Sequence, residues 1–220
     1  MSEIRLLDNL TIRPATKADA PALVPLAYSS GPSTFDYVFV DREGESALDF
    51  LSSSLSRRGG EHGFGHFSVV CHNQGDCKET EQIVGTGAGY DGYQALAHIP
   101  VATLNILRHY GPVRALGTIR RGLRTESIVN PPTGGLHYLG YLGVSRDWRG
   151  RGVGKFLIEH LLEKGRAKGR KRAALDVSVE NPRAQALYER LGFEVTKTVE
   201  SDYKSEFGHV AAHRRMVIAL

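Results

Sequence analysis

Two kinds of hydrophobic pattern divide this chain into strands and helices. Short runs rich in apolar and β-branched residues predict strands over 10–15, 66–72, 81–90, 136–144, 173–179, 193–199 and 213–220. Apolar residues spaced three and four apart predict helices over 17–29, 45–57, 155–168 and 182–191. Gly31-Pro32 and Gly59-Gly60 are expected to end the first two helices. Strands and helices in this order predict a mixed α/β fold.

The connection between the third and fourth predicted strands, residues 91–135, is long. Ala95–His109 has helical spacing, with Pro100 marking a break or a start, and Leu116–Ser127 predicts a second helix with one basic face. Over forty residues are too many for a turn. The segment suits a substrate lid or an oligomer interface, such as that of a homodimer, and the sequence leaves both open.

Length and composition fit one α/β domain over residues 1–220, with 91–135 as a helical insertion inside it. No apolar run approaches the roughly 20 residues that span a bilayer, and residues 1–8 carry charges where a signal peptide needs an apolar run. Cys71, His72 and Cys77 lack the spacing of a zinc site, and two cysteines make no disulfide framework. We therefore expect a cytoplasmic protein that binds no membrane and no metal.

Much of the net charge of +4 lies in the basic run 164–172. Cations favour the C-terminal end of a helix, where the predicted helix 155–168 stops. No aromatic residue interleaves the run, as single-stranded nucleic acid binding would require. We therefore expect a solvated helix end and no nucleic-acid partner.

A glycine-rich turn, residues 149–154, joins the predicted strand 136–144 to the next helix. The first N–H groups of a helix lack partners and carry partial positive charge, and glycines let a phosphate approach them closely. The turn is not a Walker loop, because Lys155 is followed by Phe156 rather than Ser or Thr. Its glycine spacing also departs from the dinucleotide fingerprint. The turn predicts a phosphate or pyrophosphate site, with a plain strand-to-helix connection as the alternative.

A second motif follows the strand 173–179. Asn181 suits a helix N-cap, Pro182 the first helical position and Gly192 the stop. With this motif, the last third of the chain resembles the GNAT superfamily of acyl-CoA-dependent N-acetyltransferases. The family's Arg/Gln-x-x-Gly-x-Gly/Ala motif is matched by Arg149, Gly152 and Gly154. Its Asn-x-x-Ala-x-x-Leu-Tyr-x-x-x-Gly-Phe signature is matched by Asn181, Ala184, Leu187, Tyr188, Gly192 and Phe193.

The resemblance implies a GNAT fold, a mixed and mostly antiparallel central sheet flanked by helices, here with a helical insertion before the fourth strand. It implies acetyl-CoA as co-substrate and an amine as acceptor. Backbone groups on the strand would meet the pantetheine arm, the turn would hold the pyrophosphate, and Asn181 would orient the pantetheine. The implied acetyl-CoA residues are Leu142, Gly143, Val144, Arg149, Gly150, Arg151, Gly152, Val153, Gly154, Lys155, Asn181 and Tyr188.

Acyl transfer needs an acid for the departing thiolate and a base for the amine. The resemblance implies the Tyr188 hydroxyl as the acid. Many family members carry a carboxylate base on the strand before the turn, but residues 136–144 contain none. His137 and Glu180 are the candidates for the base, and Glu126 in the insertion is a weaker one.

Two functions remain open from the sequence. The first is an N-acetyltransferase that moves acetyl from acetyl-CoA directly to a primary amine of an unidentified small molecule or peptide, without a covalent enzyme intermediate. The second is a module of the same fold that binds or senses acyl-CoA without turnover. The missing carboxylate favours the second, and the intact motif around Tyr188 favours the first.

Overall fold

The computed structural model describes residues 9–73 and 81–220. Its strands form one seven-stranded sheet in the order β1-β2-β3-β4-β5-β7-β6. The pairs are antiparallel except for β4 with β5, which run parallel. The strands are β1 Leu10–Pro14, β2 Phe67–Asn73, β3 Glu81–Asp91, β4 His137–Val144, β5 Arg172–Ser178, β6 Glu194–Val199 and β7 His213–Ala219.

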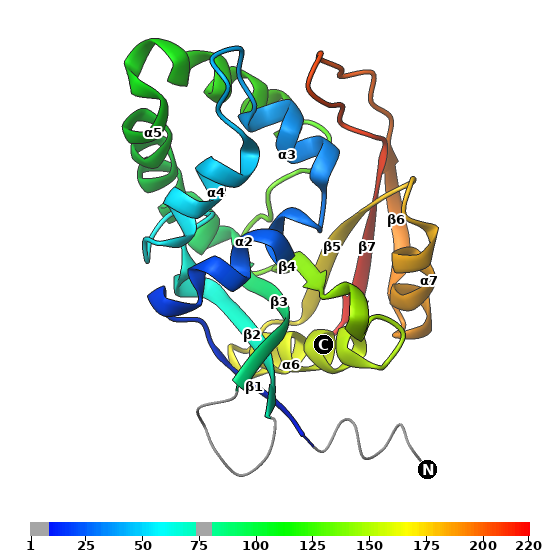
Figure 1. The fold of residues 1–220 in the computed structure, drawn as a ribbon. Coiled ribbons are helices and arrows are strands. Elements are labelled where there is room, and N and C mark those ends of the chain that lie inside the picture. Colours follow the sequence, from blue (N-terminus) through cyan, green and yellow to red (C-terminus); the bar gives the residue numbers. More distant parts are fainter. Residues whose placement is uncertain (1–8, 74–80) are drawn as a thin grey trace.

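Helices cover both faces of the sheet (Figure 1). One group, toward the top and left of the figure, comprises α2 Ala20–Tyr28, α3 Pro32–Phe39, α4 Ala47–Leu55 and α5 Gly92–Glu126. The other, toward the bottom and right, comprises α6 Val153–Ala167 and α7 Pro182–Arg190. Three short 3-10 turns complete the elements: η1 Lys17–Asp19, η2 Phe64–His66 and η4 Arg146–Trp148.

The two faces of the sheet have separate cores, because side chains on a strand alternate between faces. Leu139, Leu175 and Met216 point to the α6 and α7 side, where aliphatic residues dominate. Tyr138 and Ala174, one residue away on the same strands, point to the side of α2 and α4. A third cluster joins α3, α4 and α5. The sheet is thus a wall between two chemically different interiors.

All seven predicted strands and the four predicted helices are present, with ends that differ by a few residues. The predicted pairing of β2 with β3 as a hairpin is confirmed, although most of its expected loop lies outside the described residues. The helix α3 was not predicted. Gly31-Pro32 ends α2 as expected, but Pro32 also starts α3, since proline is well tolerated in the first turn of a helix.

The insertion forms two helices, as predicted, and they meet at Gly111, between the predicted segments Ala95–His109 and Leu116–Ser127, whereas the break or start expected at Pro100 is wrong. Gly111 has a φ of 73°, outside the helical region, whereas Pro100 lies within a continuous helix. The two halves rest on α3: the Tyr110 hydroxyl donates to the Phe39 carbonyl at 2.5 Å, and Arg121 Nε donates to the Val38 carbonyl at 3.0 Å. These contacts dock the insertion onto the α2–α4 side of the sheet.

Candidate active site

The strands β4 and β5 separate in the middle of the sheet (Figure 1). They pair only at His137 with Ala173 and at Tyr138 with Ala174, whereas β4 continues to pair with β3 as far as Val144. Beyond Tyr138, within residues 9–73 and 81–220, no ladder joins β4 to β5. Among the described residues, backbone N–H and C=O groups on this edge of β4 therefore have no strand partner and can bind a ligand, apart from the Val144 carbonyl, which accepts from Arg149 Nε.

A bulge interrupts the ladder between β4 and β3 just beyond the point where β4 and β5 separate. Ala88 pairs with Gly140 and Thr86 with Gly143, so β4 advances three residues where β3 advances two. Tyr141 carries the strain, with a φ of 56° that is uncommon for a residue other than glycine. A bulge bends its strand and turns peptide groups out of the ladder. The predicted pantetheine-binding residues Leu142, Gly143 and Val144 follow directly after it.

Gly143 lies where the end of α2 presses on β4. A Cβ built on Gly143 would fall 2.0 Å from the Leu26 carbonyl oxygen. The Ser29 hydroxyl donates to the same carbonyl at 2.7 Å. Only glycine fits at this point, so the sequence holds the end of α2 in direct contact with the bulged strand.

The glycine-rich turn has the geometry of an anion-binding helix terminus. Gly150 and Gly152 have φ values of 77° and 84°, and Gly152 is the N-cap of α6. The first intrahelical bond runs from the Phe156 N–H to the Gly152 carbonyl at 3.0 Å, which leaves the preceding N–H groups of Val153, Gly154 and Lys155 unpaired within the helix. No acidic residue lies in the first turn of α6. The turn therefore favours an anion.

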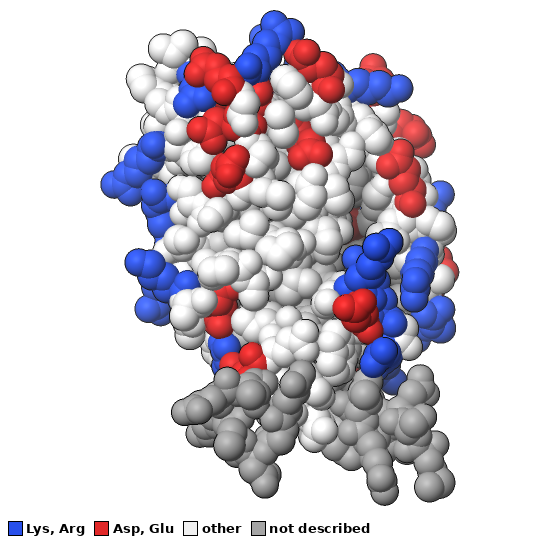
Figure 2. Space-filling view, viewed as in Figure 1, with Lys and Arg blue, Asp and Glu red and all other residues white. Residues whose placement is uncertain are grey.

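Basic side chains surround this turn. Figure 2 shows Lys and Arg gathered at the lower right of the viewed face, over the start of α6 and over α7. Arg149 Nε donates to the Val144 carbonyl at 3.1 Å, and the Arg151 guanidinium lies 5.6 Å from the Trp148 ring centroid. Both side chains belong to exposed residues, and so does Lys155, which pairs with Glu159 at 3.8 Å. The cations are held close to the turn while their charges stay accessible.

The helix α7 packs beside the start of α6. A Cβ on Gly154 would lie 3.3 Å from Leu187 Cδ2, so glycine permits this close approach. Asn181 is the N-cap of α7, and its side-chain oxygen accepts the Ala184 N–H at 3.1 Å. The predicted cap is confirmed, and it holds the Asn181 side chain at the start of α7, shortly after the end of β5.

Tyr188 is buried on the inner face of α7, against Phe193 at a ring-centroid distance of 6.1 Å. Burial raises the pKa of the Tyr188 hydroxyl to about 12. The group therefore holds its proton at neutral pH. A protonated phenol between α6 and α7 can serve as a proton donor.

His137 does not lie where a base would be needed. It is fully buried between β4 and α6, with Nε2 3.0 Å from the Leu161 carbonyl oxygen. Burial lowers its pKa to about 4. Gly89 and Gly165 close over the ring, so that a Cβ at either position would come within about 3 Å of the imidazole. This placement fits core packing and gives the ring no access to a substrate.

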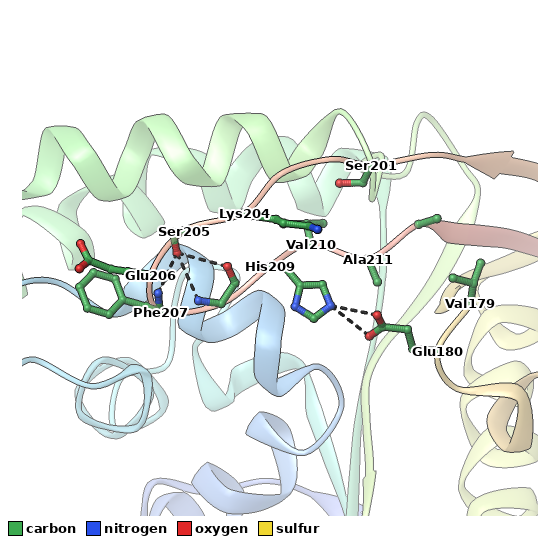
Figure 3. A pocket seen from close by; sticks show the side chains of 12 residues that line it. Val179, Glu180, Ser201, Lys204, Ser205, Glu206, Phe207, His209, Val210 and Ala211 are labelled. Atoms are coloured by element: carbon green, nitrogen blue, oxygen red, sulfur yellow. Dashed lines mark hydrogen bonds and ion pairs between the residues drawn. The ribbon is translucent and has the colours of Figure 1, made fainter.

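Glu180 lies at the edge of a pocket of about 700 Å³ between the end of β5 and the loop 201–212. Figure 3 shows its carboxylate facing His209, beside helix α3. The distance from His209 Nε2 to Glu180 Oε1 is 3.0 Å, and that from His209 Nδ1 to the Ser33 Oγ is 2.8 Å. These contacts form one hydrogen-bond chain in the tautomer in which the Ser33 hydroxyl donates to His209 Nδ1 and His209 Nε2–H donates to the Glu180 carboxylate. Ser33 and His209, which are far from Glu180 in the sequence, thus orient its carboxylate.

Sequence reasoning missed Ser33 and His209, which are 176 residues apart. Each is a single polar residue in a loop or at a helix start, so neither carries a local signal. The backbone N–H of His209 also donates to Ser33 Oγ at 3.0 Å. The pair fastens the loop 201–212 to α3 and fixes the pocket wall that faces Glu180.

A second polar group lies on the α2–α5 side of the sheet. The Tyr138 hydroxyl donates to Asp176 Oδ2 at 3.0 Å, and Arg215 forms an ion pair with the same carboxylate. Arg215 also donates to the Asn130 carbonyl at the end of the insertion. Asp176 is thus fully engaged, which ties β4, β5, β7 and the insertion together.

Glu61 was also missed by the sequence analysis. It follows α4 in a glycine-rich segment, and its carboxylate accepts the hydroxyl of Tyr141, the bulge residue, at 2.9 Å. Burial raises the pKa of Tyr141 well above its usual value. Glu126 has a raised pKa from burial and from the charge of Glu61. Glu61 thus contacts the bulge residue directly, and Glu126 lies close enough to Glu61 to be affected by its charge.

Metal-binding clusters and membrane-spanning helices are both absent from the described residues. No group of three or more His, Cys, Asp or Glu side chains within 9–73 and 81–220 could hold a metal ion. Among the same residues, no helix is both long and apolar enough to cross a bilayer.

Comparison with known proteins gives curated relatives that match part of the chain. A 5-NmdU N-acetyltransferase of Pseudomonas phage PaMx11 is 34% identical over 92 residues, which is 42% of this chain and 57% of that protein. The [Ribosomal protein bS18]-alanine N-acetyltransferase of Salmonella typhimurium is 35% identical over 68 residues, 31% of this chain and 46% of that protein. The chain thus spans about half the length of these relatives.

Solved structures match nearly the whole chain. An acetyltransferase crystal structure aligns with a TM-score of 0.62 and 21% identity, over 95% of this chain and 98% of that one. An N-acetyltransferase from Staphylococcus aureus Mu50 aligns with a TM-score of 0.63 and 17% identity, over 94% and 100% of the two chains. At these identities the likeness concerns the fold, and it confirms the predicted GNAT architecture.

The family model of the acetyltransferase (GNAT) family matches residues 44–193, from the start of α4 to the end of α7. This range contains the bulged strand, the glycine-rich turn and Tyr188. The chain therefore belongs to the acetyltransferase (GNAT) family.

Proposed function

We propose that this protein transfers an acetyl group from acetyl-CoA directly to a primary amine of a small molecule or peptide. One observation carries the proposal: the unpaired edge of β4 runs directly into the glycine-rich start of α6. A linear ligand with a diphosphate at one end and an amide-bearing arm at the other matches this succession of free backbone groups. Acetyl-CoA has both parts.

The predicted acetyl-CoA residues divide by the chemistry they offer. Backbone groups of Leu142, Gly143 and Val144 would meet the amides of the pantetheine arm and the thioester oxygen. The N–H groups that start α6, with Arg149 and Arg151, would hold the diphosphate. Donors aimed at the thioester oxygen stabilise the charge that develops there during transfer.

Tyr188 would act as the acid. As the amine nitrogen bonds to the acetyl carbon, the carbon–sulfur bond breaks and the thiolate of CoA needs a proton. A phenol whose pKa is raised to about 12 is protonated at neutral pH and can donate to the sulfur. Its buried place between α6 and α7 keeps competing water away.

Glu180 would act as the base and accept the proton that the amine loses. Its side chain is 59% exposed and borders the pocket, and His209 holds the carboxylate in one orientation. His137 has no part in this proposal because it is sealed in the core. Direct transfer needs the amine and acetyl-CoA bound together, one on each side of the separated strands.

The experiment measures release of the free CoA thiol from acetyl-CoA across a panel of mono-amines, diamines, amino nucleosides and peptides. We expect turnover with at least one amine, and initial rates that require both substrates bound at once. Tight CoA binding without thiol release for every amine would instead support an acyl-CoA-binding module. Acetyl-enzyme formed in the absence of amine would contradict direct transfer.

A further inference from the structure

Exposed apolar side chains gather on the insertion helix. Nine of the eleven large apolar residues that are exposed among the described residues belong to α5. Soluble monomers rarely leave such side chains contiguous, and contiguous patches mark interaction sites. The outer face of α5 is therefore a candidate interaction surface.

The first half of α5 carries a symmetric stripe. Its six exposed large apolar residues are Tyr93, Leu96, Ile99, Val101, Leu104 and Leu107. They form three pairs at equal sequence distances from Pro100: Tyr93 with Leu107, Leu96 with Leu104, and Ile99 with Val101. At 100° per residue, Tyr93, Leu96, Leu104 and Leu107 fall within about 40° of the direction of Pro100, and Ile99 and Val101 flank them on either side. The apolar positions of the stripe are therefore symmetric about Pro100.

The stripe also lacks charge. The sixteen residues from Gly92 to Leu107 include no Asp, Glu, Lys or Arg, and the first cation is Arg108. A surface for nucleic acid or for anionic lipid would carry cations among the apolar residues. A neutral apolar stripe is typical of the core of an interface between identical subunits, where charged residues are depleted.

We propose that α5 pairs with α5 of a second copy, antiparallel, about a two-fold axis at Pro100. In an isologous contact, residue i meets residue j and j meets i. This axis pairs Leu96 with Leu104 of the partner subunit, and Tyr93 with Leu107 of the partner subunit, so each apolar residue meets an apolar residue. No charged residue of α5 lies within the paired segment, and the cations at its rim include Arg108 and also Arg170, whose guanidinium lies 5.8 Å from the Tyr93 ring centroid.

The size of the stripe sets the expected strength. From Tyr93 to Leu107 the helix is about 21 Å long. At a helix width of about 10 Å the stripe covers on the order of 200 Å², less than the roughly 800 Å² per partner of a standard interface. We therefore expect a reversible dimer with a dissociation constant on the order of 10–100 µM.

Sedimentation of the full chain from about 1 to 300 µM tests the proposal. The mass should rise with concentration from 24.1 kDa toward twice that value. A mass that stays at 24.1 kDa at the highest concentration would overturn the proposal.

Charge variants test the register. Leu96→Glu should weaken association at least tenfold, and so should Leu104→Lys, since each buries a charge against leucine. The double variant should recover association, because the two-fold axis then places an acidic side chain at position 96 of each subunit opposite a basic side chain at position 104 of the other, which gives two ion pairs. Leu48→Glu is the control, since Leu48 is similarly exposed, at 41% against 43% for Leu104, and lies on α4.

Single variants that still dimerise, or no recovery in the double variant, would contradict this pairing. Circular dichroism checks the fold of each variant.

Discussion

The two faces of the sheet differ in the side chains that form their cores and in the groups they offer to a ligand. On the α6 and α7 face the core is aliphatic, and the candidate cofactor contacts come from backbone groups and glycines. On the α2–α5 face the core is rich in aromatic and titratable side chains, including Tyr90, Tyr138, Tyr141, His62 and His66. Backbone N–H groups of a glycine-rich turn bind phosphate through a contiguous sequence pattern, whereas side chains that select a ligand come from several distant segments. The α6 and α7 face therefore carries motifs, and the α2–α5 face does not.

The largest effect should come from Tyr188→Phe, which removes the proposed acid but keeps the aromatic packing against Phe193. We expect kcat to fall by about 10²–10³-fold with little change in CoA affinity, because the hydroxyl acts on the departing thiolate. Steady-state rates and calorimetric titration with CoA separate the two quantities. Unchanged kcat would remove Tyr188 from the mechanism.

The next effect should come from Gly152→Val, which forces a β-branched residue into a φ of 84° at the start of α6. We expect CoA affinity to fall by about 100-fold, since the anion-binding N–H groups would be misplaced. Gly169→Val is the matched control, because Gly169 has a φ of 67° with nothing within 4 Å of its Cβ position and lies beyond the other end of α6. Equal losses in both variants would indicate general destabilisation.

Glu180→Gln should lower kcat by about tenfold, less than a buried base would, because water reaches the exposed carboxylate site. Glu206→Gln is the control, as Glu206 borders the same pocket but pairs with Arg42. His209→Ala should have a smaller effect than Glu180→Gln, since His209 only orients the carboxylate. Equal rates for both glutamate variants would argue against Glu180 as the base.

The smallest effect concerns stability on the α2–α5 face. Burial lowers the pKa of His66 to about 3, below its usual 6.5, so the unfolded state binds a proton that the folded state refuses. This contribution is complete above pH 6.5 and is lost as the pH falls toward 3. Between pH 7.5 and 5.5 it amounts to about 1.4 kcal/mol.

Urea unfolding of His66→Gln at the two pH values measures this term, because the variant lacks the titrating ring. The variant should lose less stability than the parent protein when the pH is lowered. An identical loss in both would show that His66 does not titrate differently on unfolding.

The sequence predicted the elements that depend on local patterns. Strand composition, the cap at Asn181 and the stop at Gly192 are each set by a few adjacent residues, and all three are present. The helix α3 was missed because Pro32 marks both an end and a start. The junction between the two insertion helices was predicted between His109 and Leu116, and Gly111 supplies it with a non-helical φ. The break or start expected at Pro100 is wrong, because a helix can continue past an exposed proline.

The candidate site was less accessible to sequence reasoning where it depends on tertiary contact. The glycine turn and Tyr188 follow contiguous motifs. His137 was chosen for its intrinsic pKa, but strand alternation turns it to the aliphatic face, where burial lowers that pKa to about 4. Ser33, Glu61 and His209 meet their partners only after distant segments fold together. The interface proposed for the insertion likewise rests on which of its residues stay exposed, and the sequence alone does not give this.

Because Gly143 has no side chain, the backbone of β4 lies directly against the backbone at the end of α2. Where the Leu26 carbonyl touches the strand, no layer of side chains cushions the end of α2 from the peptide groups proposed to receive the thioester. Any movement of β4 at this point therefore meets the backbone of α2 directly. Through Ser33 at the start of α3, the same helical layer contacts the loop that borders the Glu180 pocket.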